Sequence, residues 1–147
     1  MLPNGRRMAI DYGDVRIGIA LSDPQGILAS PLKTISANSA VSEIAGLVIE
    51  NEVSVIYLGL PLHLSGLESP SSSKAKDFGL RLKAALNGEF QLRFIDERLS
   101  TKSAALRSSM TGKKVSKEDI DQLAAVEILE FALQIEEKTK GLGGHEI

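Results

Sequence analysis

Two short apolar runs joined by an aspartate and a glycine constrain this chain more than any other feature. The segment MAIDYGDVRIGIA, residues 8–20, ends its first run on Asp11, turns through Gly13 and resumes as a second apolar run. Because glycine tolerates the positive φ of a tight turn, the segment predicts a β-hairpin. A carboxylate at the end of a buried strand is costly unless a cation or hydrogen bonds offset it. The pattern therefore favours a functional role for Asp11, and capping of the turn is the alternative.

Composition limits the chemistry available to the chain. Its 147 residues match one domain in size, and 43% of them are hydrophobic, enough for a sizeable core. Cysteine is absent and the only histidines are His63 and His145, so a bound metal would need oxygen ligands, as Mg²⁺ and Mn²⁺ prefer. No apolar run reaches the roughly 20 residues of a membrane span, and the N-terminus lacks the apolar core of a signal peptide. The sequence thus predicts a cytoplasmic protein without a membrane partner.

The order of the predicted elements indicates the fold class. Strands are predicted at about residues 7–11, 16–22, 32–35, 53–60 and 92–96, and helices at about 38–51, 75–86, 101–110 and 118–138. Three consecutive strands predict an antiparallel meander, and strands separated by helices predict parallel right-handed crossovers. The result is an α/β, ribonuclease H-like arrangement, a five-stranded mixed sheet with helices on both faces. Residues 1–139 are expected to form one domain and the glycine-rich residues 140–147 a flexible tail.

Three acidic positions stand out from apolar surroundings. They are Asp11, the pair Asp96-Glu97 after the last strand, and Asp121 in the last helix. The first and last strands run parallel, so Asp11 and the pair should share the sheet edge where ligands bind in open α/β folds. Small residues after Asp121 would let its helix approach the sheet. Clustered carboxylates repel, and two divalent cations would relieve the repulsion. The alternatives are capping by Asp96 and a helix-dipole role for Asp121; one member of the pair must face away from the other.

A basic segment follows the last strand. From Arg98 to Lys117 the chain carries six basic residues and no acid, although its net charge is -2. Such a segment is typical of phosphate binding, and a solvated helix face is the alternative. Aromatic residues make up only 4%, which disfavours base stacking on an aromatic platform. We expect Lys102, Arg107, Lys113 and Lys114 to contact backbone phosphates, giving affinity without sequence reading.

Several motifs resemble the YqgF family, also called RuvX, of bacterial Holliday junction resolvases and pre-16S ribosomal RNA nucleases. The resemblance covers about residues 8–133 and rests on DYG at 11–13, RIG at 16–18, GLPL at 59–62, DERLST at 96–101, and on Gly66, Ala104, Asp121 and the alanines at 124–125. It implies a ribonuclease H-like fold of the RuvC-resolvase type and metal-dependent phosphodiester hydrolysis. The chain departs from the family at His63, where asparagine is usual, and at Asp14, where threonine or lysine is common.

The resemblance also implies roles for individual residues. Asp11, Glu97 and Asp121 would be the catalytic, metal-binding acids, with Asp96 as the alternative to Glu97. Arg16 and Arg98 would contact phosphate or orient the acids. The metal would be Mg²⁺ or Mn²⁺, with two ions at the site.

The leading hypothesis is an endonuclease acting on structured RNA or branched DNA. It would process the 5′ end of precursor 16S rRNA or resolve Holliday junctions, through in-line attack by metal-activated water. A non-catalytic nucleic-acid-binding factor in ribosome maturation is the alternative. A sugar-kinase- or actin-type ATPase would need two such domains, which the chain length disfavours. No exposed heptad demands a dimer, so we expect a monomer or a weak homodimer.

Overall fold

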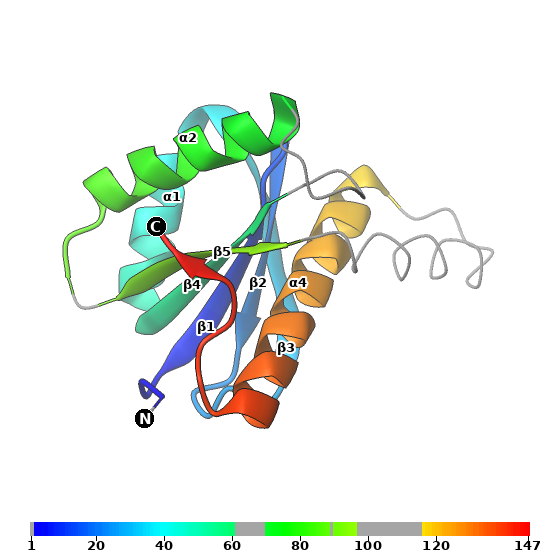
Figure 1. The fold of residues 1–147 in the computed structure, drawn as a ribbon. Coiled ribbons are helices and arrows are strands. Elements are labelled where there is room, and N and C mark those ends of the chain that lie inside the picture. Colours follow the sequence, from blue (N-terminus) through cyan, green and yellow to red (C-terminus); the bar gives the residue numbers. More distant parts are fainter. Residues whose placement is uncertain (1, 61–69, 89, 97–115) are drawn as a thin grey trace.

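A computed structural model describes residues 2–60, 70–88, 90–96 and 116–147 (Figure 1). The described elements are β1 Arg6–Asp11, β2 Arg16–Ser22, β3 Ala29–Ser36, a 3₁₀ turn at Ala37–Ser39, α1 Ala40–Glu50, β4 Val53–Leu60, α2 Pro70–Ala85, β5 Gln91–Asp96, α4 Lys117–Thr139 and β6 His145–Glu146. The predicted helix at about residues 101–110 lies outside the described residues. Helices α1 and α2 cover one face of the sheet and α4 covers the other (Figure 1).

The sheet has the strand order β3-β2-β1-β4-β5-β6. Strands β1, β2 and β3 form the predicted antiparallel meander, and β4 and β5 run parallel to β1. The mixed α/β fold is therefore confirmed. Strand β3 begins earlier than predicted because its pairing with β2 extends to Ser22 opposite Ala29.

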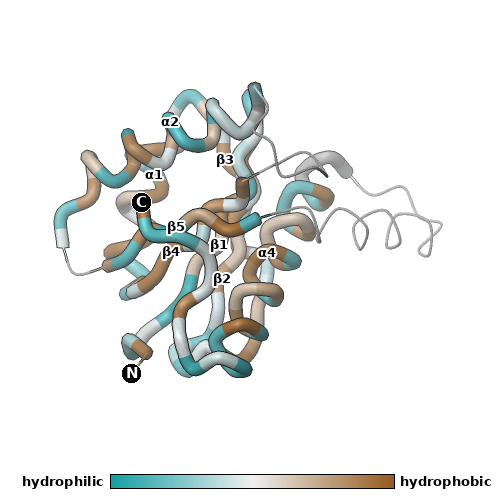
Figure 2. The backbone as a smooth tube through the Cα atoms, viewed as in Figure 1, coloured by the Kyte–Doolittle hydropathy of each residue, from teal (hydrophilic) through white to brown (hydrophobic). Residues whose placement is uncertain are grey.

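Two apolar layers hold the helices on the sheet. On the α1/α2 face, Ile10, Ile44 and Phe78 belong to one buried cluster. On the α4 face, the strands contribute the small residues Ala9 and Ala20, which pack against helix residues such as Ala125, Leu129 and Ala132. Figure 2 shows hydrophobic segments along the strands and along α4. Small side chains on both sides let α4 lie close to the sheet, as predicted.

Within the described residues, the sheet has six strands rather than the predicted five. The sixth comes from residues 140–147, which the sequence predicts to be a flexible tail. Strand β6 pairs with β5, and the Ile147 amide donates to the Leu92 carbonyl at 3.0 Å. Arg93 donates to the carbonyls of Gly143 and Gly144. Gly144 has a φ of 66° and a Cβ there would overlap the Phe94 carbonyl, so glycine is required for the chain to lie this close.

Helix α4 has well-defined ends. The Ser116 side chain accepts a hydrogen bond from the Asp119 amide at 3.1 Å, and Lys140 ends the helix in the left-handed conformation. Among the described helices, none is long and apolar enough to cross a bilayer.

Candidate active site

The pleat of β1 directs Asp11 toward α4. Met8 and Ile10 belong to the α1/α2 cluster, whereas Ala9 packs on the α4 side. Because side chains alternate along a strand, Asp11 lies on the α4 face and Tyr12 on the opposite face. The Tyr12 ring packs against Phe78 of α2, with centroids 5.0 Å apart. This contact anchors the chain directly after Asp11 and fixes the face to which Asp11 belongs.

Asp121 reaches the same place from α4. Gly18 is the cross-strand partner of Asp11, and the backbone of Asp121 lies directly over Gly18. A Cβ at Gly18 would be 2.1 Å from the Asp121 carbonyl oxygen and 3.1 Å from the Asp121 Cβ. The backbones of two predicted acids, 110 positions apart in the numbering, therefore lie next to the same glycine.

Arg16 completes this group, which we name the acidic edge: Asp11, Arg16, Gly18 and Asp121. The Arg16 Nε donates to the Asp121 Oδ2 at 3.0 Å, and both side chains are partly exposed. The guanidinium offsets the negative charge of the Asp121 carboxylate. The sequence predicts that Arg16 contacts phosphate or orients the acids. In the structure, Arg16 contacts one of these acids, Asp121.

Replacing Gly18 with alanine should destabilise the fold and disturb the acidic edge. The new Cβ would collide with backbone atoms of Asp121, which cannot rotate away, so α4 must shift. Overpacking of this kind costs about 1–3 kcal/mol. We expect a lower urea midpoint in Gly18→Ala. As a control, Gly46→Ala on α1 has nothing within 4 Å of its new Cβ and should match or exceed wild-type stability. Equal midpoints for Gly18→Ala and wild type would contradict the close approach.

Asp96 lies on the other face of the sheet. Leu92 and Phe94 pack with the α1/α2 cluster, while Ile95 packs on the α4 side. The same alternation places Asp96 with Leu92 and Phe94, away from Asp11. Its pair Glu97 lies outside the described residues.

Most of the predicted basic contacts also fall outside the described part of the chain. These are Arg98, Lys102, Arg107, Lys113 and Lys114. His63, where the chain departs from the family pattern, also lies outside the described residues. Within the described ranges, no group of three metal-ligating side chains is assembled. Asp14, whose role the sequence leaves open, forms an exposed ion pair with Lys74 of α2 at 3.2 Å. Nothing local in the sequence signals this pair, whereas the glycine in the second strand could have signalled the close approach of α4.

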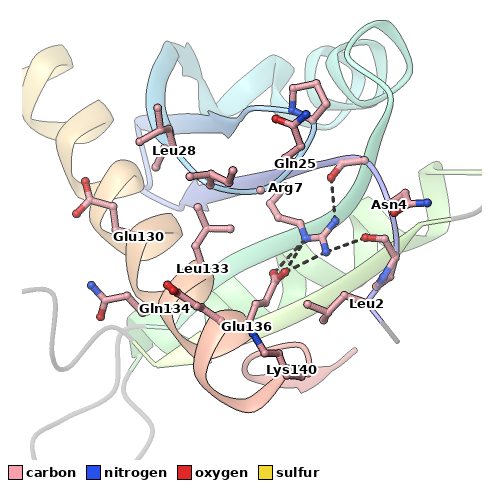
Figure 3. Close-up of a pocket in the computed structure, with 17 residues that line it drawn as sticks. Leu2, Asn4, Arg7, Gln25, Leu28, Glu130, Leu133, Gln134, Glu136 and Lys140 are labelled. Atoms are coloured by element: carbon pink, nitrogen blue, oxygen red, sulfur yellow. Dashed lines mark hydrogen bonds and ion pairs between the residues drawn. The ribbon is translucent and has the colours of Figure 1, made fainter.

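A cavity of about 850 Å³ lies at the opposite end of the sheet, beside the start of β1 and the end of α4 (Figure 3). Arg7 and Glu136 occupy its wall. The Arg7 guanidinium donates to Glu136 at 3.0–3.1 Å and to the carbonyls of Pro3 and Gly5 at 2.9 Å. Because these contacts already engage the three guanidinium nitrogens, the Arg7 side chain is not open to a ligand.

Tyr57 ties this ion pair to the C-terminal segment. Its hydroxyl donates to Glu136 at 2.7 Å and accepts from the Gly143 amide at 3.2 Å. Burial raises the pKa of Tyr57, and the hydrogen bond to Glu136 raises it further, so the hydroxyl remains a donor. Helix α4 is thus held at both ends, by Gly18 and Arg16 near its start and by Arg7 and Tyr57 near its end.

Known proteins resemble this chain in sequence and in fold. Residues 5–135 match the RuvX family, described as Holliday junction resolvase. A protein of Clavibacter sepedonicus named "Putative pre-16S rRNA nuclease" is 44% identical over 138 residues, covering 90% of this chain and 84% of that protein. A Streptomyces coelicolor protein of the same name is 40% identical over 137 residues, covering 90% and 81%.

Solved structures show the same architecture at low sequence identity. Thermus thermophilus RuvC in complex with a Holliday junction substrate has a TM-score of 0.61 and 12% identity, covering 97% of this chain and 99% of that one. RuvC of the same organism in a second structure has a TM-score of 0.55 at 8% identity, with the same coverage. These likenesses confirm the predicted RuvC-type, ribonuclease H-like fold. Together with the match over residues 5–135, they show that the chain belongs to the RuvX family.

Proposed function

We propose that this protein is a divalent-metal-dependent endonuclease that hydrolyses phosphodiester bonds in structured nucleic acid. The observation that carries the proposal is the position of Asp11 and Asp121 on either side of Gly18, at the carboxyl end of β1: Asp11 is the cross-strand partner of Gly18 and the Asp121 backbone lies over it. The names of the relatives and of the family make pre-16S rRNA the first substrate to test and a Holliday junction the second. A cytoplasmic location, predicted from the sequence, suits both.

The residues of the acidic edge fit a hard cation. Both acids offer carboxylate oxygens, the ligands that Mg²⁺ and Mn²⁺ prefer. The Arg16 Nε contacts one oxygen of the Asp121 carboxylate, Oδ2, at 3.0 Å. Asp11 and Asp121 would hold the metal. Two divalent ions, when bound, supply an activated water and stabilise the leaving oxygen. Arg16 would keep the Asp121 carboxylate oriented.

Glu97 is our choice for the third acid, in place of Asp96. The pleat of β5 puts Asp96 on the face opposite Asp11. The resemblance to the family implies Glu97, whose position lies outside the described residues. Arg98 and the basic residues at 102, 107, 113 and 114 remain predicted phosphate contacts.

Glu97→Gln should therefore lose most cleavage activity, whereas Asp96→Asn should retain most of it. Removing a ligand oxygen of a catalytic metal forfeits several kcal/mol of transition-state stabilisation, or about a hundredfold or more in rate. Single-turnover cleavage would be measured for both variants in Mg²⁺ and in Mn²⁺, with Mn²⁺ binding followed separately by its paramagnetic resonance signal. A larger loss in Asp96→Asn would reverse the assignment.

The activity itself is tested with three labelled substrates. A precursor 16S rRNA fragment, a four-way DNA junction and a linear duplex would be incubated with Mg²⁺, Mn²⁺ or EDTA. We expect cleavage of one of the structured substrates, sparing of the duplex and complete inhibition by EDTA. Tight binding with no cleavage in either metal would instead favour the non-catalytic maturation factor.

A further inference from the structure

Charge is divided unevenly between the helices that flank the sheet. Helix α2 carries four basic residues and one acid, a net charge of +3. Helix α4 carries seven acids and two basic residues, a net charge of -5, and α1 carries two acids and no basic residue. A polyanion approaching the acidic edge would therefore be attracted along α2 and repelled along α4.

Helix α2 begins close to the acidic edge. Figure 1 shows its first turn beside the carboxyl ends of β1 and β4. Lys74, in the second turn, reaches Asp14 at the tip of the β1–β2 hairpin. Phe78, one turn later, contacts Tyr12, the residue after Asp11. The hairpin that carries Asp11 and this part of α2 thus form one continuous surface.

Lys74 and Arg81 form a ridge along this surface. Residues seven apart lie on the same side of a helix, about 10.5 Å apart along its axis. Both side chains are exposed, and the Arg81 guanidinium lies 5.7 Å from the centre of the Phe78 ring. The other basic pair, Lys76 and Lys83, lies on the opposite flank, where Lys83 donates to the Ile147 carbonyl. Lys74 and Arg81 are therefore the cations that continue from the hairpin.

We propose that the α2 ridge, Lys74 and Arg81, binds the phosphate backbone of the nucleic acid whose scissile bond lies at the acidic edge. The inference rests on the proposed function and extends its surface to a helix outside the basic segment at 98–117. Exposed ion pairs are weak, so a phosphate can displace Asp14 from Lys74. Asp14 then acts as a competing anion that weakens binding.

Binding at several salt concentrations tests the ridge. A labelled four-way DNA junction and a labelled RNA hairpin would be titrated in EDTA, where no cleavage interferes. Each lost phosphate contact should make the slope of log affinity against log salt shallower by about 0.7–0.9. At 0.1 M salt this corresponds to about five- to eightfold weaker binding for Lys74→Gln and for Arg81→Gln. Asp14→Asn should bind more tightly than wild type.

A charge-matched control separates the ridge from net charge. Lys138→Gln removes one exposed positive charge from the far end of α4 and should keep the wild-type slope. Slopes for Lys74→Gln and Arg81→Gln equal to that of Lys138→Gln would overturn the proposal. Cleavage is scored separately. Ridge-dependent slopes without any cleavage would contradict the proposed function alone, and cleavage with unchanged slopes would contradict the ridge alone. A loss on only one substrate assigns the ridge to that nucleic acid.

Discussion

Replacing Asp11 with asparagine should reduce cleavage by about a hundredfold or more while leaving the fold intact. Asparagine has the shape of aspartate but lacks the charge and one of the ligand oxygens. Catalytic metal sites contribute several kcal/mol to transition-state stabilisation, and each 1.36 kcal/mol is tenfold in rate. The Asp11 side chain lies on the α4 face, and its cross-strand partner Gly18 lies beneath the backbone of Asp121. Single-turnover rates, with thermal unfolding measured in parallel, would test both statements.

The matched control for Asp11→Asn is Asp119→Asn. Asp119 is an exposed acid near the start of α4, two residues before Asp121, and its backbone amide rather than its carboxylate contacts Ser116. We expect its cleavage rate to stay near that of wild type. A wild-type rate in Asp11→Asn would remove Asp11 from the catalytic group and favour its role as a turn cap.

Glu136→Gln should destabilise the fold by about 3–5 kcal/mol, the cost of removing one partner of a buried ion pair. The Arg7 side chain is only 4% exposed and that of Glu136 only 7%, so solvent cannot replace the lost charge. For a chain of this size the loss corresponds to a melting temperature lower by about 6–20 °C. Urea unfolding followed by circular dichroism would measure the change in the free energy of unfolding.

Two further variants make the Glu136 result interpretable. Glu137→Gln changes the exposed neighbour and should have almost no effect on stability. The double variant Arg7→Met/Glu136→Gln removes both charges and keeps an acceptor for the Tyr57 hydroxyl, so it should recover much of the lost stability. If the loss in the double variant equalled the summed losses of Arg7→Met and Glu136→Gln measured singly, the two charges would not be coupled.

The sequence predicts the parts of this fold that depend on local pattern. Alternation and turn chemistry place the β1–β2 hairpin, and β4 is predicted with its observed bounds because its residues are uniformly apolar and buried. The approach of the Asp121 helix to the sheet also follows, since the small residues after Asp121 leave room for it. These features need only strand period, helix period and the handedness of crossovers.

Other features depend on contacts between distant residues, which the local sequence pattern does not predict. Arg7 and Glu136 are 129 positions apart, and Lys74 and Asp14 are 60 apart. Strand β6 has only two residues and follows several glycines. This glycine-rich composition predicts a flexible tail rather than a strand. The position of β6 depends on the backbone of β5 and on Arg93, whose hydrogen bonds hold the carbonyls of the tail. Such pairings can be predicted only when the partner surface is known.

The distance in sequence between the two halves of the acidic edge has a consequence for protein synthesis. The hairpin with Asp11 leaves the ribosome well before the helix that carries Asp121 and covers β1, β2 and β3. Contacts this distant form late, because the intervening chain must be ordered first. A nascent or truncated chain that ends at β5 therefore contains Asp11 but lacks α4, the helix that carries Asp121. Assembly of the proposed metal site is thereby tied to the synthesis of α4.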